Sequence, residues 1–191
     1  MNKAENKLII IVAPSGAGKS TLIKKIHKDF EAIKESVSFT TRKMRPGDIE
    51  GVSYFFISKE EFQEKIKNDD FLEWAQVHSN YYGTSKSFIK KQLDIGHTIL
   101  LDIDTQGADA LKNIYHDRAK AIFICPPSIE ELEKRLVFRG SDSIEIIKER
   151  INNAKKELLK KDCYDYLVVN DNLETAYDKL KIIITEILHK K

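Results

Sequence analysis

The sequence predicts an α/β fold in which helices wrap a parallel sheet. Short runs that are wholly or almost wholly apolar recur along the 191-residue chain, as at Leu8–Ala13 and Ala119–Ile124. Each run is followed by a stretch whose apolar residues have helical spacing. Fully apolar strands of this kind are typical of parallel sheets that helices cover on both faces. The chain length suits one compact domain with small insertions.

The other elements follow in order along the chain. We predict helices at 20–30, 58–66, 86–94, 106–115, 128–139, 144–160 and 173–189, and buried strands at 71–77, 97–102 and 166–169. Capping boxes at Ser58-x-x-Glu61 and Ser128-x-x-Glu131 open two of these helices. Residues 37–57 are rich in Ser, Thr, Tyr and Phe and contain turn signals, so we predict short antiparallel strands inserted off the main sheet.

Composition narrows the class of protein. The chain is 41% hydrophobic and 32% charged, with a formal net charge of +2, so neither disorder nor a nucleic-acid partner is expected. Cys125 and Cys163 lack metal-ligand spacing and favour a reduced, cytoplasmic setting. No apolar run approaches the roughly 20 residues of a membrane span, so no membrane partner is expected. Composition leaves the oligomeric state open.

A glycine-rich turn between the first strand and the first helix predicts a phosphate-binding P-loop. The segment "APSGAGKS", Ala13 to Ser20, has the strand-loop-helix context that this motif requires. Its glycines let backbone N–H groups approach phosphate oxygens at the positive end of a helix. Lys19 can reach the β- and γ-phosphates, and the Ser20 hydroxyl can ligate Mg²⁺. The motif has Ala13 where glycine is usual, and the alternative is a plain helix-start turn with a surface lysine.

Arginine is scarce, which makes its positions informative. Of 32 basic residues only six are arginine, the residue type that binds phosphate in a planar, bidentate way. Arg42 and Arg45 share one loop and could clamp a phosphate together, with Tyr54 and Tyr82 as hydroxyl donors. The alternatives are a solvated basic loop and, for Tyr54, a half-buried strand tyrosine. Three further arginines lie in one helical stretch, where salt bridges are the alternative: Arg135, Arg139 and Arg150.

Five longer blocks of sequence resemble the guanylate kinase family in order and spacing. They are "APSGAGKSTL", "SFTTRKMRPGDIEGVSYFF", "FLEWAQVHSNYYGTS", "ILLDIDTQGADAL" and "PPSIEELEKRLVFRG". The resemblance runs from about Leu8 to the last helix. It implies transfer of the γ-phosphoryl group of ATP to GMP in purine nucleotide metabolism, with Mg²⁺ as cofactor. Bacterial-type members often have alanine at the first P-loop position, in agreement with Ala13.

The resemblance also implies a division of the chain into three parts. It implies a P-loop NTPase-type core at residues 1–37, 88–127 and 162–191. A small mixed-strand GMP-binding insertion would occupy residues 38–87, and a helical lid residues 128–161. Gly140, between the two lid helices, suits a mobile segment and equally a plain helix stop.

Site residues follow from the resemblance in three groups. The ATP site would comprise Ala13, Pro14, Ser15, Gly16, Ala17, Gly18, Lys19, Ser20 and Thr21. The GMP site would comprise Ser38, Arg42, Arg45, Tyr54, Glu73, Tyr82, Thr84 and Asp104. The catalytic cations would be Lys19, Arg42, Arg135, Arg139 and Arg150. Ser20 would hold Mg²⁺, and Asp102 would either support the metal through water or cap a helix.

Guanine chemistry gives Glu73 a reason to be acidic. Guanine presents N1–H and N2–H₂ donors, which a carboxylate accepts, and an O6 acceptor, which a hydroxyl serves. Adenine would leave such groups unpaired, and sites built this way discriminate by about 10⁴–10⁵. Two other interpretations stay open at this point. One is a kinase for another nucleoside monophosphate, against which Glu73 and Ser38 argue. The other is a non-enzymatic binding module, which typically has a damaged P-loop.

Overall fold

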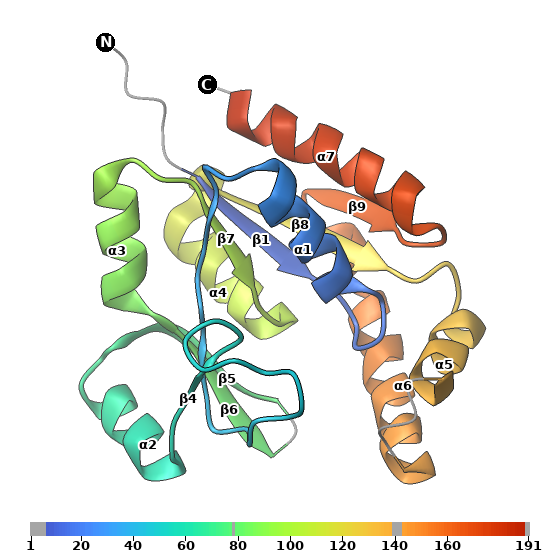
Figure 1. Cartoon of the computed structure of the whole chain (residues 1–191), viewed down its shortest axis with the longest axis horizontal. Helices are drawn as coiled ribbons and strands as arrows, with labels where there is room; N and C mark the ends of the chain where they lie inside the picture. Colours follow the sequence, from blue (N-terminus) through green and yellow to red (C-terminus); the bar gives the residue numbers. More distant parts are fainter. Residues whose placement is uncertain (1–6, 78, 139–142, 190–191) are drawn as a thin grey trace. The chain divides into compact units, whose positions relative to one another are not determined.

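The computed structural model describes residues 7–77, 79–138 and 143–189 (Figure 1). The strands are β1 (Leu8–Val12), β2 (Lys34–Glu35), β3 (Phe39–Thr40), β4 (Phe55–Phe56), β5 (Phe71–Val77), β6 (Asn80–Ser85), β7 (Ile99–Asp102), β8 (Ala119–Cys125) and β9 (Tyr166–Val169). The helices are α1 (Lys19–Asp29), α2 (Lys59–Lys67), α3 (Lys86–Ile95), α4 (Thr105–Tyr115), α5 (Ile129–Phe138), α6 (Ile144–Leu158) and α7 (Leu173–His189), with 3-10 turns η1 (His116–Arg118) and η2 (Lys161–Cys163). The predicted α/β class is confirmed, since β1, β2, β7, β8 and β9 belong to one sheet and helices connect its strands.

The described chain divides into two compact units. The first comprises residues 7–8 and 32–119, and the second comprises residues 9–31 and 120–189. The second unit is therefore built from two pieces of chain that are far apart in sequence.

The first unit contains a parallel strand pair and a separate four-stranded sheet. Strands β2 and β7 run parallel, with Lys34 opposite Ile99. The separate sheet has the order β4-β3-β6-β5, and its β5–β6 pair is antiparallel. The prediction of antiparallel strands within residues 37–57 is wrong for β3 and β4, which run parallel with Phe39 opposite Phe55. A long loop joins these strands, so the chain can return before pairing in the same direction.

Aromatic rings form much of the small sheet's core. The Phe62 ring of α2 stacks on Phe71 with ring centroids 4.5 Å apart and on Tyr81 at 5.4 Å. Phe39 stacks on Phe55 at 4.8 Å. Phe62 is fully buried, so this cluster gives the four-stranded sheet a core independent of the parallel strands.

Helix α7 joins the two pieces of chain that make up the second unit. Strands β8 and β9 pair in parallel, and α7 packs along β9 and α1 (Figure 1). Two ion pairs join the helices: Lys25 with Glu174 at 2.6 Å and Lys181 with Asp29 at 2.8 Å. The Tyr177 hydroxyl donates to the Lys25 carbonyl at 2.9 Å. The C-terminal half of α1 is therefore fixed to the last helix of the described chain.

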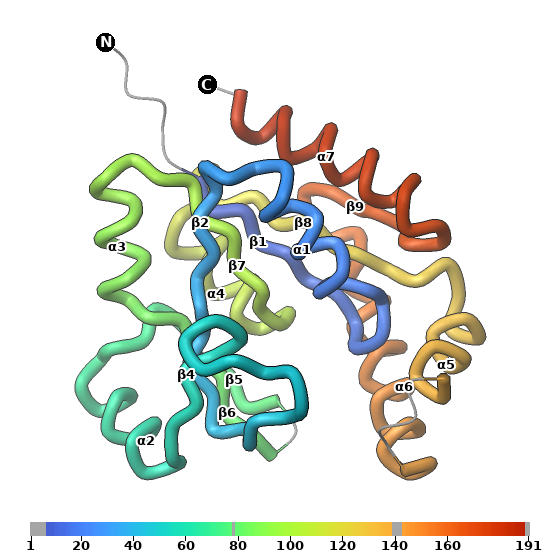
Figure 2. Tube along the Cα trace, viewed as in Figure 1, coloured from blue at the N-terminus to red at the C-terminus, as the bar shows by residue number. Residues whose placement is uncertain are grey.

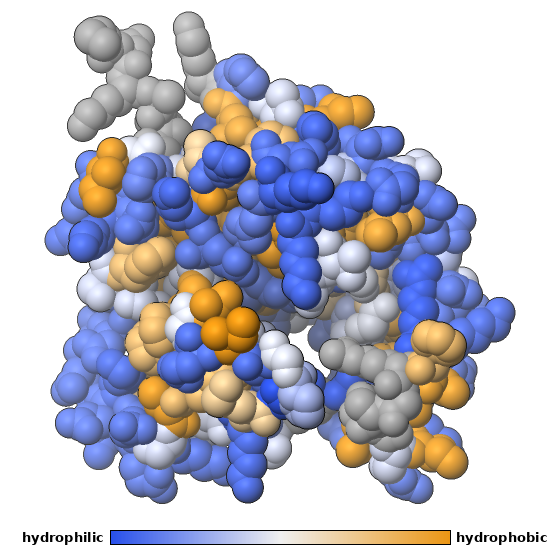
Figure 3. All heavy atoms as spheres, viewed as in Figure 1, coloured by the Kyte–Doolittle hydropathy of each residue, from blue (hydrophilic) through white to orange (hydrophobic). Residues whose placement is uncertain are grey.

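One predicted capping box is confirmed in full, and the other in one of its two hydrogen bonds. At Ser58 both bonds of the capping box are present, and the Ser128 hydroxyl accepts from the Glu131 N–H. Cys125 is buried and Cys163 exposed. None of the helices in the described part of the chain combines the length and apolarity that a membrane crossing needs. The face in Figure 3 is largely hydrophilic, and apolar atoms gather over the loop that connects β3 to β4, where Met44, Ile49 and Val52 are exposed.

Candidate active site

The glycine-rich turn connects a buried strand to a helix, as the motif predicts. Figure 2 shows the chain turning between β1 and α1. Gly18 precedes α1 with φ 91°, and the Ala17 N–H donates to the Pro14 carbonyl at 3.1 Å. Helix α1 begins at Lys19, so the positive end of its helix dipole belongs to the motif itself. The φ angle of Ala13 is not positive, so an alanine can replace the usual glycine there without backbone strain.

The turn is supported by side chains from distant elements. Asn170, which follows β9, is buried, and its side-chain amide donates to the Ala17 carbonyl at 2.7 Å. A Cβ added at Gly18 would lie 2.3 Å from that amide nitrogen. A Cβ at Gly16 would lie 3.0 Å from Leu132 and Leu136 of α5. The glycines are therefore required by close packing beneath the loop as well as by their positive φ.

Two of the three predicted lid arginines contact groups near this turn. Arg150 of α6 donates to the Ser15 hydroxyl at 3.4 Å. Arg135 of α5 donates to the Asn170 carbonyl at 3.0 Å and pairs with Glu131 at 3.1 Å. Arg139 and Gly140 lie outside the described residues. The second unit thus gathers the P-loop, Arg135 and Arg150.

A second cluster forms in the first unit around Arg42. The Arg42 guanidinium lies over the Tyr54 ring, 5.3 Å from its centroid, and pairs with Asp48 at 2.9 Å. The rings of Tyr54 and Tyr82 meet edge to face at 5.8 Å. Burial raises the pKa of Tyr54, so its hydroxyl keeps its proton and remains a donor. Arg42, Tyr54 and Tyr82 therefore present donors together.

Asp48 organises this loop and was not predicted. Its N–H donates to the Arg45 carbonyl at 3.0 Å across a turn in which Gly47 has φ 90°. Its carboxylate accepts from the Arg45 N–H at 2.7 Å, and the hydrogen bond from Arg42 lowers the pKa of Asp48. The side chain of Arg45 is left exposed. The Pro-Gly turn is visible in the sequence, whereas the Asp48 pairing depends on how the loop folds back.

A buried carboxylate lies near the N-terminus of α4. Glu73 of β5 is 9% exposed, and the Thr84 hydroxyl donates to it from the paired strand β6. Burial raises the pKa of Glu73 to about 7, and the charge of Asp104 adds to this effect. Asp104 caps α4 by accepting from the Gly107 N–H at 2.8 Å. Glu73, Thr84 and Asp104 thus lie close together.

The remaining predicted residues lie at strand and helix ends. Ser38 is buried just before β3. Asp102 ends β7, and the capping role left open for it at α4 belongs to Asp104. Ser20 is exposed in the first turn of α1. No cluster of three or more His, Cys, Asp or Glu side chains suited to a metal occurs in the residues that the structure describes.

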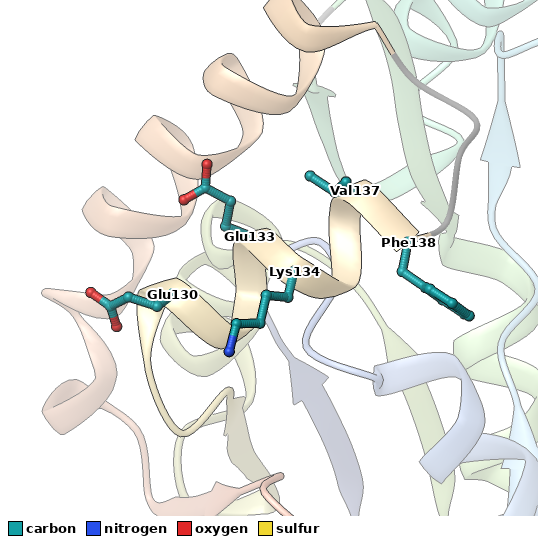
Figure 4. A pocket seen from close by; sticks show the side chains of 5 residues that line it. All are labelled: Glu130, Glu133, Lys134, Val137 and Phe138. Carbon is teal, nitrogen blue, oxygen red and sulfur yellow. The ribbon is translucent and has the colours of Figure 1, made fainter.

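A surface hollow of about 460 Å³ lies beside α5, and none of the predicted site residues lines it. Glu130, Glu133, Lys134, Val137 and Phe138 line it (Figure 4). All five come from one helix, and Phe138 is 95% exposed. The hollow lacks the convergent polar groups of a phosphate or nucleobase site.

Comparison with known proteins decides the family. Residues 5–187 match the family model described as Guanylate kinase. The chain belongs to the guanylate kinase family. It is 48% identical over 184 residues to the guanylate kinase of Pseudoalteromonas translucida, covering 96% of this chain and 89% of that protein. It is 44% identical over 183 residues to the guanylate kinase of Sulfurimonas denitrificans, with 96% and 89% covered.

A solved guanylate kinase has the same fold. The crystal structure of guanylate kinase from Anaplasma phagocytophilum superposes with a TM-score of 0.80 at 31% sequence identity. The match covers 99% of this chain and 89% of that one. The fold class predicted from the apolar strands is therefore that of a guanylate kinase.

Proposed function

We propose that this chain transfers the γ-phosphoryl group of ATP to GMP and releases ADP and GDP. Membership of the guanylate kinase family supports the proposal. The observation that carries it is the buried Glu73 carboxylate beside the Thr84 hydroxyl. A carboxylate accepts from the N1–H and N2–H₂ groups of guanine, whereas adenine has neither donor and would leave the buried carboxylate with Thr84 as its partner but without those bonds.

The proposal gives each nucleotide its own set of residues. Residues Ala13 to Thr21 bind the phosphates of ATP. The phosphate of GMP is bound by Arg42, Arg45, Tyr54 and Tyr82, and its base by Ser38, Glu73, Thr84 and Asp104. The division into a core (1–37, 88–127, 162–191), a GMP-binding insertion (38–87) and a lid (128–161) is part of the proposal. The cytoplasmic setting stays a prediction.

The chemistry needs positive charge more than it needs a general base. The GMP phosphate is already an anion, so no proton must be removed before it attacks. Charge accumulates on the oxygens of the transferred group, and fixed cations stabilise it. Arg150 near Ser15 and Arg135 near Asn170 support this role, because both lie on the unit that contains the P-loop. Lys19, Arg42 and Arg139 complete the proposed set.

Mg²⁺ belongs to the proposal as the cofactor. Mg²⁺ prefers hard oxygen ligands, keeps several waters and is commonly bound by one or two protein groups plus substrate phosphates. The exposed Ser20 hydroxyl beside Lys19 suits that mode, which needs no acidic cluster. Asp102 would support the metal through water. When bound, Mg²⁺ neutralises charge on the β- and γ-phosphates.

ADP release from Mg-ATP, with GMP, AMP, CMP, UMP or dTMP offered separately, tests the function. We expect strong turnover with GMP alone. Glu73→Gln should lower kcat/KM for GMP by at least about 100-fold, because a carboxamide presents a donor to a guanine donor. Preference for another nucleotide would contradict the guanine assignment. A folded chain that releases no ADP above the acceptor-free background would instead favour a binding module.

A further inference from the structure

Glycine occupies a helical position of the first unit where another residue would form a better helix. Gly107 lies in the first turn of α4, and its φ angle is not positive. Its conformation is therefore open to any residue, and alanine would favour the helix by roughly 1 kcal/mol. Local backbone geometry does not explain the glycine, so its neighbours must.

The neighbour is the carboxylate of Glu73. A Cβ added at Gly107 would lie 2.6 Å from Glu73 Oε2 and 3.0 Å from Glu73 Cδ. Real Cβ atoms do not approach heavy atoms this closely, so an added methyl group must displace the carboxylate. Helix α4 packs against β5, which holds the backbone of Glu73 in place. The part that can yield is the end of the Glu73 side chain.

Two further hydrogen bonds restrict where the Glu73 carboxylate can lie. The Thr84 hydroxyl donates to Glu73 Oε1, and the Gly107 N–H is already taken by Asp104. Oε1 is thus fixed from the strand side, while Oε2 occupies the space where a side chain at position 107 would begin. A residue without a Cβ leaves Oε2 in this position while Oε1 is bound to Thr84.

We propose that Gly107 is a positioning residue that sets guanine recognition by leaving room for the Glu73 carboxylate. This inference rests on the proposed function, because it assumes that Glu73 accepts the guanine donors. Gly107 itself touches no reacting atom. A methyl group at position 107 moves the acceptor away from the base, and the helix stays intact.

Gly107→Ala tests the inference, with Asn113→Ala as its matched control. Asn113 is exposed on the same helix, so its replacement also favours the helix but leaves Glu73 untouched. We expect Gly107→Ala to raise the KM for GMP about 10- to 100-fold, with kcat and the KM for ATP within about threefold of wild type. The control should match wild type in all three constants. Circular dichroism should show both variants folded.

A Glu73→Ala background separates positioning from general damage. With the carboxylate removed, Gly107→Ala should have no further effect on the GMP Kd measured by NMR titration. The inference is overturned if Gly107→Ala behaves like Asn113→Ala, or if it weakens GMP binding equally in the Glu73→Ala background. Either result leaves the proposed function standing when the wild type phosphorylates GMP. A wild-type chain that does not bind GMP overturns both.

Discussion

Glu73 makes the stability of the protein depend on pH. Burial, with the added charge of Asp104, raises its pKa to about 7, so the native state binds this proton more tightly than the unfolded chain does. This contribution to stability is full below the unfolded pKa and is lost as the pH rises through about 7. Glutamine does not titrate, so the free energy of unfolding of Glu73→Gln, relative to that of wild type, should rise by roughly 3 kcal/mol from acidic pH to pH 8.

Urea unfolding of wild type and Glu73→Gln at several pH values measures this difference. The m-values should agree, so that the midpoints report stability alone. A gap between the two proteins that stays constant across the pH range would contradict the prediction. It would mean that the pKa of Glu73 is the same in the folded protein as in the unfolded chain.

Asn170 acts at the same scale on the other unit. Its amide bonds the Ala17 carbonyl and lies against Gly18, so its removal leaves a buried acceptor unpaired beneath the P-loop. We expect Asn170→Ala to cost about 1–3 kcal/mol of stability and to raise the Kd of a non-hydrolysable ATP analogue about tenfold. Asn152→Ala, exposed on α6, is the control. An unchanged Kd for the analogue would show that the loop keeps its shape without this support.

At the scale of elements, the Ser58 capping box offers a clean test of local stability. Its hydroxyl accepts from the Glu61 N–H at 3.0 Å, and the Glu61 carboxylate accepts from the Ser58 N–H at 2.7 Å. Ser58→Ala should lower the free energy of unfolding by about 1 kcal/mol, while Gln63→Ala on the exposed face of α2 should be nearly neutral. Chemical denaturation measures both. Equal stability of the two variants would contradict the importance of the cap.

Elements were predictable where their signals are local. The strand at Phe71–Val77 and the helix at Leu173–His189 match the prediction, because apolar periodicity and flanking residues lie within each segment. β2, β3 and β4 have two residues each, which is too short for any periodicity. β6 at Asn80–Ser85 was missed because its alternation of polar and apolar residues is weak. The direction of β4 depends on the loop before it, and no local pattern encodes that path.

At the scale of the molecule, the two nucleotides should stabilise the protein independently. A ligand at about 100 times its Kd adds roughly 2.7 kcal/mol to stability. We expect Lys19→Ala to abolish the melting shift caused by the ATP analogue and to keep the shift caused by GMP. Arg42→Ala should do the reverse. Thermal melts of each variant with each nucleotide check this, and loss of both shifts in either variant would contradict it.

The residues proposed to bind the nucleotides were predictable from the sequence, whereas the residues that hold them in place were not. Lys19, Ser20, Arg42 and Glu73 stand in sequence blocks from which their proposed chemical roles are predicted. The supporting residues act on partners far along the chain, as Asn170 does on Ala17 and Gly107 on Glu73. Such contacts exist only once the fold has formed. An isolated asparagine or glycine has no distinguishing pattern before then.

The discontinuity of the second unit bears on how the protein is made. Synthesis delivers the glycine-rich turn well before Asn170 and before the helix that contacts α1 through Glu174 and Lys181. Because ribosomes add about 5–20 residues per second, the segment 9–31 waits about 7–28 seconds for its partners. Residues 32–119 form one continuous stretch that can fold in the meantime. A nascent chain should therefore complete the support of the glycine-rich turn only after residues 170–189 have been made.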